Sequence, residues 1–201
     1  MIAIVDYGVG NLLSVRNMLA KAGAQAEITN DPEKIRHADK LLLPGVGHID
    51  HAMRKLDESG LREVLDEVAL KMQKPVLGIC LGSQILGRGS EEGALPGLGW
   101  IDMFSKRLPV SQQFRVPHMG WNEISPVKEC ALFTTMQADA RFYFVHSYYM
   151  ECADPEDVAA TVSHGITFTC AVQKGNIYGT QFHPEKSLKH GLALMRAFDA
   201  I

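Results

Sequence analysis

The sequence has little that would place it in a membrane or on nucleic acid. None of its apolar runs is long enough to cross a bilayer. The net charge of -3 gives no basic excess that would attract a phosphate backbone or an anionic lipid surface. No basic segment precedes the apolar residues 2–6, so they predict a first strand and not a signal peptide. We therefore expect a cytoplasmic protein that binds neither nucleic acid nor membrane.

Signals for disulfides, metals and cofactors are also lacking. A phosphate-binding GxxxxGK[ST] sequence is absent, and Leu13 stands where the third glycine of a dinucleotide fingerprint would be. His48 and His51 have no further ligands at a spacing suited to a metal ion, so no metal site and no cofactor are expected. The four cysteines form no CxxC pair and no disulfide framework, which is typical of a reducing compartment: Cys80, Cys130, Cys152 and Cys170.

Short apolar runs alternate with helical patterns in the first half of the chain. Asn11 is a candidate cap for the first helix. This alternation predicts an α/β fold with a mostly parallel sheet and helices on both faces, whose ligand sites gather at the carboxyl ends of the strands. The expected strands are 2–6, 26–29, 40–44 and 75–79, and the expected helices are 12–22, 49–57 and 61–72.

The second half is richer in strand-like segments separated by turns. We expect these strands to form an added antiparallel layer, and a last helix to follow at 187–200. No repeat or linker divides the chain, so a single domain over residues 1–201 is the simplest interpretation. The strand-like segments are 100–104, 120–124, 141–149, 158–162, 167–173 and 176–182.

A cysteine flanked by glycines ends the fourth predicted strand. Gly78 and Gly82 lie two residues before and two residues after Cys80, which is the cysteine form of the G-x-S-x-G nucleophile elbow. The glycines would relieve crowding in a sharp strand-to-helix turn, and the N-terminus of the following helix would favour the thiolate. Taken alone, the motif is equally compatible with Cys80 as a small buried apolar residue.

A thiol nucleophile needs a histidine and a group that orients it. His183 closes a predicted strand, and Glu185 lies two residues further on, within reach of its ring. Glu185 also suits the first turn of the last helix, and both roles are compatible. His118 and His146 are candidates for the same cleft, although neither has an acid two residues away. The loop 44–47 is either an oxyanion hole made of backbone N–H groups or a plain strand-to-helix turn.

Together these segments resemble the class I glutamine amidotransferases, and within that family the glutaminase subunits of imidazole glycerol phosphate synthases. The resemblance covers nearly the whole chain and implies a flavodoxin-like fold. It also implies hydrolysis of L-glutamine by a triad in which Cys80 forms a glutamyl thioester, His183 is the base and Glu185 orients it. The segments are 6–11 (DYGVGN), 44–47 (PGVG), 78–82 (GICLG), 116–122 (VPHMGWN), 142–148 (FYFVHSY) and 181–187 (QFHPEKS).

The same resemblance implies further roles. The glutamine would be held by Gln84 and the backbone of His146, Ser147 and Tyr148. The loop with Gly45, Val46 and Gly47, together with Leu81, would supply the oxyanion contacts. A separate synthase (cyclase) subunit would form a heterodimer with the chain and receive the ammonia, near Asn11, Trp121 and Lys186.

Three positions depart from the usual family pattern: Ser83, Ile49 and Thr180. None of them removes a catalytic group. Two segments, 183–195 and 98–102, look like those of paralogous glutaminases that supply ammonia to an ATP-dependent sugar amidotransferase in surface-polysaccharide synthesis. This alternative stays open. A catalytically silent flavodoxin-like binding module is a third alternative. A silent module need not retain all four residues of the following set, so their presence argues against it: Cys80, His183, Glu185 and Gln84.

Overall fold

The computed structural model describes residues 1–110, 114–137 and 139–201. At its centre, neighbouring strands run parallel to one another, and most of their residues are buried, as strands covered on both faces require. Their order in space is β2 (Ala26–Thr29), β1 (Ile2–Val5), β3 (Lys40–Gly45), β4 (Val76–Cys80) and β13 (Ile177–Thr180).

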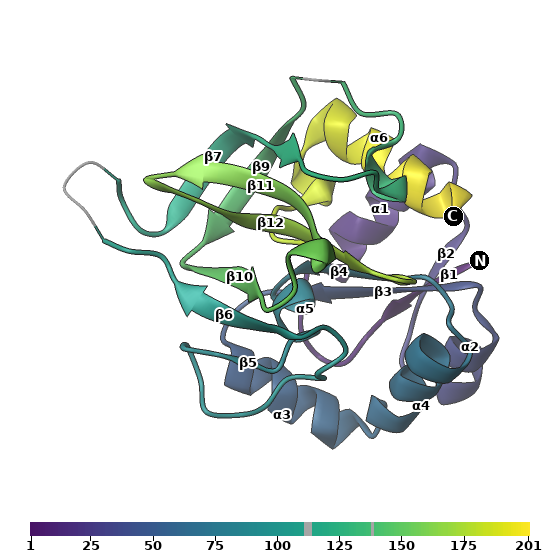
Figure 1. Ribbon diagram of the computed structural model, residues 1–201. Helices are drawn as coiled ribbons and strands as arrows, with labels where there is room; N and C mark the ends of the chain where they lie inside the picture. Colours follow the sequence, from purple (N-terminus) through teal and green to yellow (C-terminus); the bar gives the residue numbers. More distant parts are fainter. Residues whose placement is uncertain (111–113, 138) are drawn as a thin grey trace.

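Helices cover both faces of this sheet (Figure 1). One face carries α1 (Leu12–Ala22) and α6 (Leu188–Ala200), and the other carries α2 (Pro32–His37), α3 (Ile49–Ser59) and α4 (Arg62–Asp66). Side chains alternate between the two faces along a strand. Accordingly, Ile4 and Leu42 pack in the core beneath α1 and α6, whereas their neighbours Val5, Leu41 and Leu43 pack in the opposite core.

The antiparallel strands extend the sheet beyond β13. They are β12 (Ile166–Lys174), β10 (Tyr148–Cys152) and β6 (Met103–Arg107), with β11 (Val158–His164) paired to β12. Two further strands, β7 (His118–Glu123) and β9 (Arg141–His146), form a separate two-stranded sheet. The predicted α/β fold, with a mainly parallel sheet, flanking helices and added antiparallel strands, is confirmed.

Some predicted strand bounds are wrong. The segment 141–149 is not one strand, because the chain passes at Ser147 from β9 in the small sheet to β10 in the large one. The segment 100–104 enters the sheet only at Met103, since the Trp100 indole Nε1 donates to Asp66 Oδ1 of α4 (2.6 Å) and holds that side chain against the helix. The helix expected over 61–72 is α4 continued by a π-helical turn, Glu67–Lys71.

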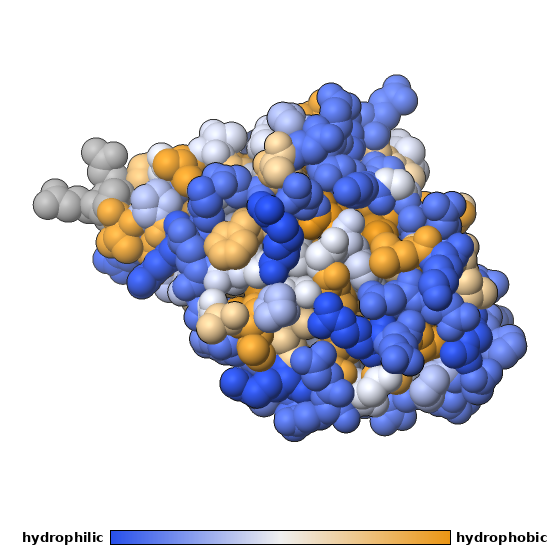
Figure 2. All heavy atoms as spheres, turned by 60° about the horizontal axis from the view of Figure 1, so that its bottom comes forward, coloured by the Kyte–Doolittle hydropathy of each residue, from blue (hydrophilic) through white to orange (hydrophobic). Residues whose placement is uncertain are grey.

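The surface is mostly hydrophilic on the face shown in Figure 2, with small hydrophobic patches between charged side chains. Within the described ranges, no helix is long and apolar enough to cross a membrane.

Candidate active site

The strand order brings three distant segments to one edge of the sheet. β4 lies between β3 and β13, and Gly45 at the end of β3 is paired in register with Cys80 at the end of β4. His183 follows the end of β13 by three residues. Because carboxyl ends of parallel strands share one edge, the 45–47 loop, Cys80 and His183 become neighbours.

Cys80 occupies a sharp backbone turn. Its φ of 56° and ψ of -113° lie in a region that non-glycine residues rarely adopt, at a cost of about 1–3 kcal/mol. The turn is crowded, because a Cβ on Gly82 would lie 1.8 Å from Leu43 O and one on Gly78 would lie 2.6 Å from Gly82 O. Ser83 Oγ closes the turn by donating to Cys80 O (2.7 Å). The steric role predicted for the two glycines is thus confirmed.

The helix expected after Cys80 is short. α5 (Leu81–Gln84) has only four residues, so few peptide dipoles are aligned behind the sulfur. A helix dipole is therefore a weak source of thiolate stabilisation at this position. A neighbouring cation is the stronger source.

His183 is that cation, and Glu185 holds it. The ring Nδ1 donates to Glu185 Oε1 (2.7 Å), which leaves Nε2 for the sulfur, and both side chains are only 2% exposed. The second carboxylate oxygen, Oε2, is buried and accepts no hydrogen bond from the described residues. The buried negative charge of Glu185 is consequently compensated mainly by a protonated His183.

The pKa of His183 reflects this arrangement. Burial acts to lower the pKa, but hydrogen bonds to Cys80 and Glu185, and the negative charges of both groups, outweigh it and raise the pKa to about 9. At neutral pH His183 is therefore an imidazolium, and it lies beside the Cys80 sulfur as a proton donor for a reaction at that sulfur.

The backbone around His183 is also fixed. Its N–H donates to Tyr143 O (2.9 Å), and Ser187 Oγ donates to His183 O (2.6 Å) while accepting from Tyr143 N–H (2.9 Å). These bonds join the end of β13 to β9 of the small sheet. The histidine is thus positioned by two sheets at once.

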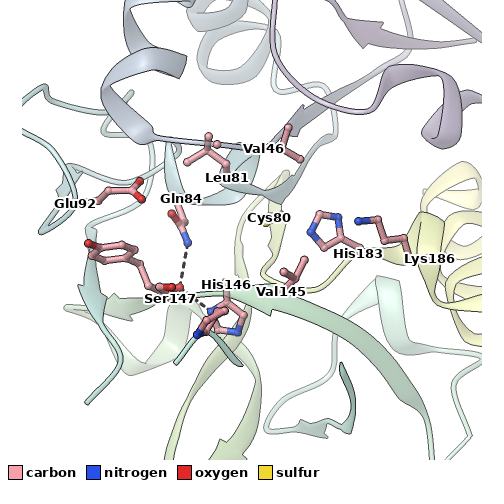
Figure 3. Close-up of a pocket in the computed structure, with 13 residues that line it drawn as sticks. Val46, Cys80, Leu81, Gln84, Glu92, Val145, His146, Ser147, His183 and Lys186 are labelled. Atoms are coloured by element: carbon pink, nitrogen blue, oxygen red, sulfur yellow. Dashed lines mark hydrogen bonds between the residues drawn. The ribbon is translucent and has the colours of Figure 1, made fainter. Parts of the chain in front are cut away.

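A pocket of about 340 Å³ opens between these groups (Figure 3). Gln84 and Glu92 lie towards one end of it, and His183 and Lys186 towards the other. Its full lining is Val46, Gly47, Cys80, Leu81, Gln84, Glu92, Pro117, Val145, His146, Ser147, Tyr148, His183 and Lys186. Nearly all of the predicted catalytic and substrate residues thus come together here, with Glu185 behind His183.

Gly45 is the exception among the predicted substrate residues. It does not line the pocket, and a Cβ at this position would lie 2.4 Å from Gly82 N, so the glycine permits the 45–47 loop to pack against the elbow. Tyr7 OH anchors the start of the loop by donating to Pro44 O (2.8 Å). By contrast, Val46 is 43% exposed, and a Cβ on Gly47 would meet nothing within 4 Å.

Comparison with known proteins identifies the family. The model of the family "Glutamine amidotransferase class-I" matches residues 3–198 of the chain. The chain belongs to this family. Among solved structures, it resembles an amidotransferase described as "Crystal structure of glutamine amidotransferase" (TM-score 0.76, 17% identity, 100% of this chain and 99% of that one), which shows a shared fold.

Curated amidotransferase relatives align along their whole length. A protein of Pseudomonas aeruginosa named "Imidazole glycerol phosphate synthase subunit HisH 2" is 52% identical over 98% of each chain. The protein of the same name from Methanococcus maripaludis is 49% identical over 98% of each chain. A Bdellovibrio bacteriovorus protein named "Imidazole glycerol phosphate synthase subunit HisH" is 44% identical over 100% of each chain.

Two residues at the site of this amidotransferase, Gln181 and Glu92, carry no predicted role, and only Glu92 lines the pocket. Gln181 is buried beside the elbow, where its Nε2 lies 3.8 Å from Cys80 Sγ and its Oε1 accepts from Gln84 Nε2 (2.9 Å). Its position two residues before His183 is the sequence signal that could have identified it, because residues i and i+2 of an extended segment point to the same side. Glu92 lies in a loop without any motif, and its Oε2 accepts from the Ile49 N–H at the start of α3 (2.9 Å).

The residues predicted at the partner interface are exposed. Trp121 on β7 packs edge-on against Tyr143 (6.1 Å between ring centroids), and Lys186 Nζ lies 5.8 Å from the centroid of the same ring. Lys186 also lines the pocket of the amidotransferase, whereas Asn11 and Trp121 do not. Asn11 caps α1, as predicted, by accepting from Ser14 N–H (3.4 Å).

The other three cysteines have no catalytic setting. Burial raises the pKa of Cys130 and, well above its ordinary value, that of Cys170. It also raises the pKa of Cys152, to about 12, assisted by the negative charge of Asp157. Their thiols are therefore protonated at neutral pH, in agreement with the prediction that Cys130 and Cys170 are core residues.

Proposed function

We propose that this chain is the glutaminase subunit of an imidazole glycerol phosphate synthase in histidine biosynthesis. The observation that carries the proposal is the hydrogen-bonded Glu185–His183 pair beside Cys80 at the edge of a pocket of about 340 Å³. The full-length relatives named as subunits of that synthase support it. We infer that the chain acts as one amidotransferase domain over residues 1–201, in a cytoplasmic heterodimer with a cyclase subunit.

The first half of the reaction forms a thioester. The Cys80 thiolate attacks the carboxamide carbon of glutamine, and the carbonyl oxygen becomes an oxyanion beside Val46, Gly47 and Leu81. The His183 imidazolium then donates its proton to the amide nitrogen. The C–N bond breaks, and ammonia leaves with a glutamyl thioester remaining on the sulfur.

The second half regenerates the enzyme. Neutral His183 removes a proton from water, the resulting hydroxide attacks the thioester carbon, and the C–S bond breaks to release glutamate and the thiolate. Glu185 keeps the imidazole in one tautomer throughout and stabilises its positive charge. No cofactor takes part in either half.

Substrate placement follows from the two ends of the pocket. The reacting carboxamide belongs near Cys80, and the α-ammonium belongs near Glu92, the carboxylate at the other end. Gln84 and the backbone of Ser147 and Tyr148 would hold the chain between them. Ammonia then leaves past Lys186 towards the surface with Trp121 and Asn11, where the partner would dock.

A glutamine analogue with an electrophilic carbon tests the nucleophile. We expect it to label Cys80 alone, because the other three thiols are protonated. Cys80→Ala should lower glutaminase turnover in the presence of the partner by about 10⁴-fold or more. Cys152→Ala is the matched control and should retain activity.

Label found on Cys130, Cys152 or Cys170, or substantial turnover by folded Cys80→Ala, would refute the nucleophile. The partner is tested separately, by adding either a histidine-pathway cyclase or an ATP-dependent sugar amidotransferase. Stimulation by the cyclase is expected. If the sugar amidotransferase stimulates glutaminase activity and the cyclase does not, the chain belongs to surface-polysaccharide synthesis instead.

A further inference from the structure

Two buried histidines, one in the wall of the pocket and one behind it, have side chains that take no part in the reaction steps above. His118 on β7 and His146 on β9 face each other in the register of the small sheet, and they are only 3% and 7% exposed. Their rings meet through His118 Nδ1 and His146 Nε2, 3.0 Å apart. His146 lines the pocket, whereas His118 lies one layer further back.

The pocket end of this pair fixes one tautomer. His146 Nδ1 lies 2.8 Å from Tyr148 O. A carbonyl oxygen can only accept, so Nδ1 of His146 carries the proton. In the neutral ring Nε2 must then be an acceptor, and the atom facing it, Nδ1 of His118, must be a donor.

At the other end of the pair, Asn122 independently fixes the same direction of hydrogen-bond donation. Asn122 Oδ1 accepts from the Glu123 N–H (2.9 Å), and Asn122 Nδ2 donates to Ser163 O (2.9 Å). The second N–H of that amide points at His118 Nε2 (3.3 Å), which must accept. A neutral His118 is therefore protonated at Nδ1, as the pocket end requires. The bonds form one directed chain from Asn122 through His118 and His146 to the Tyr148 carbonyl.

The surroundings keep both rings neutral. His118 stacks on Phe144 and on His164, with ring centroids 4.6 and 4.2 Å away. Burial, assisted by the charge of His164, lowers the pKa of His118 to about 4. Burial lowers the pKa of His146 to about 3, against the hydrogen bond to Tyr148, and the charges of His118, His164 and His183 act in the same direction as burial. An added proton on either Nε2 would place two donors against each other.

We propose that His118 and His146 are positioning residues that hold the substrate-binding backbone of the pocket. The chain ends on Tyr148 O, which also accepts from Gln84 Nε2 (3.1 Å). One carbonyl thus receives the predicted glutamine-binding side chain and the end of the histidine chain. Ser147, where the backbone passes from β9 to β10, is held at its carbonyl by the Leu108 N–H (2.8 Å), and the next carbonyl along, Tyr148 O, is held by the histidine chain and Gln84. This inference rests on the proposed glutaminase function and specifies how its substrate site is maintained.

The test separates binding from chemistry. His118→Phe keeps a ring of similar size and breaks the two hydrogen bonds of His118. We expect the KM for glutamine to rise about tenfold, the equivalent of roughly one hydrogen bond, with kcat changed by less than about twofold. His118→Asn places an amide donor at the position of Nδ1 and should restore most of the affinity.

The matched control is His164→Phe. This ring stacks on His118 but bonds only Arg115 O (2.9 Å) among the described residues, so the chain stays intact and KM should not change. Equal KM values for wild type and His118→Phe would overturn the proposal. So would equal KM values for His118→Phe and His118→Asn, because the effect would then come from packing.

A measurement that needs no turnover tests the histidine hydrogen-bond chain separately from the proposed glutaminase function. In nitrogen-edited NMR spectra of the wild-type chain, the His118 and His146 rings should both appear as the Nδ1–H tautomer at neutral pH. An Nε2–H tautomer at either ring would overturn the chain, whatever the activity. Absence of glutaminase activity in the wild-type complex, with both rings in the Nδ1–H form, would instead count against the proposed function.

Discussion

Two buried histidines in this chain have pKa values displaced in opposite directions. The pKa of His183 is raised to about 9, and that of His146 is lowered to about 3. Burial acts to lower both. The difference comes from their partners, since His183 lies between the Cys80 sulfur and a carboxylate, whereas His146 bonds a carbonyl and has only other histidines as charged neighbours. These opposite shifts suit the two proposed roles, an acid–base catalyst at His183 and a fixed hydrogen-bond link at His146.

Replacing Glu185 by Gln should therefore act through His183. We expect glutaminase kcat to fall by roughly 10²- to 10⁴-fold, the usual range for losing a correctly oriented acid–base group. Activity of the wild type should decline as pH rises through about 9, where His183 loses the proton that ammonia needs. In Glu185→Gln this decline should begin at lower pH, because Cys80 remains but the charge of Glu185, the other group that raises the pKa of His183, is gone.

The measurement is the pH dependence of kcat in the complex, together with the ultraviolet absorbance of the thiolate in the free chain. Lys186→Gln provides a control on the neighbouring exposed side chain, and it should leave the alkaline decline of kcat in place. If the alkaline decline of kcat in Glu185→Gln begins at the same pH as in the wild type, Glu185 is not the group that orients His183 and stabilises its protonated form.

At the scale of elements, the sequence predicted those parts that local patterns determine. The buried runs of β1, β3 and β4 and the cap of α1 at Asn11 were identified because burial on both faces and capping leave local signatures. The break at Ser147 was missed, because an apolar alternation shows that a segment is extended but not which sheet it joins. Trp100 was misassigned for a related reason, since its partner Asp66 is distant in sequence.

The candidate site divides in the same way. Cys80 and His183 follow strands with clear patterns, so their meeting could be inferred from parallel topology. Glu92 and Gln181 were assigned no role because their positions depend on contacts between segments far apart in the chain, to Ile49 and to Gln84. Side chains that bind through such contacts leave no periodic signal.

The elbow gives a prediction at this scale. Gly82→Ala should destabilise the fold by about 3 kcal/mol or prevent folding, because its Cβ would overlap Leu43 O of the neighbouring strand at 1.8 Å. Gly89→Ala is the matched control, since the nearest atom to its Cβ is a Phe104 side-chain carbon at 3.2 Å. Urea unfolding of both variants measures the difference. Similar midpoints would show that the elbow tolerates a side chain that its geometry excludes.

At the scale of the whole molecule, the catalytic edge and the proposed partner surface adjoin each other. Val46 of the 45–47 loop and Lys186 line the mouth of the pocket, and both are exposed. The loop has a fixed end and a free end, because Tyr7 holds Pro44 O, whereas the Cβ position of Gly47 has no neighbour within 4 Å. Gly47 also has a φ of 95°, a conformation that glycine adopts at little steric cost. A docked partner would therefore meet the one part of the oxyanion region that is free to rearrange.

This arrangement predicts a glutaminase that has low activity alone and becomes active when its partner binds. Ammonia released into water at neutral pH becomes ammonium and ceases to be a nucleophile, so uncoupled hydrolysis would waste glutamine. A partner that binds one state of the 45–47 loop better than the other would shift the loop towards that state by its differential affinity. We expect the isolated chain to hydrolyse glutamine slowly and a cyclase with bound acceptor to raise kcat by on the order of 10²-fold, about what one oxyanion donor contributes. Steady-state kinetics with and without cyclase and acceptor measure this directly, and full activity in the isolated chain would show that the oxyanion site is already complete. Gly47→Ala should weaken the activation while leaving the labelling of Cys80 possible, because a side chain at that φ restricts the loop without entering the elbow.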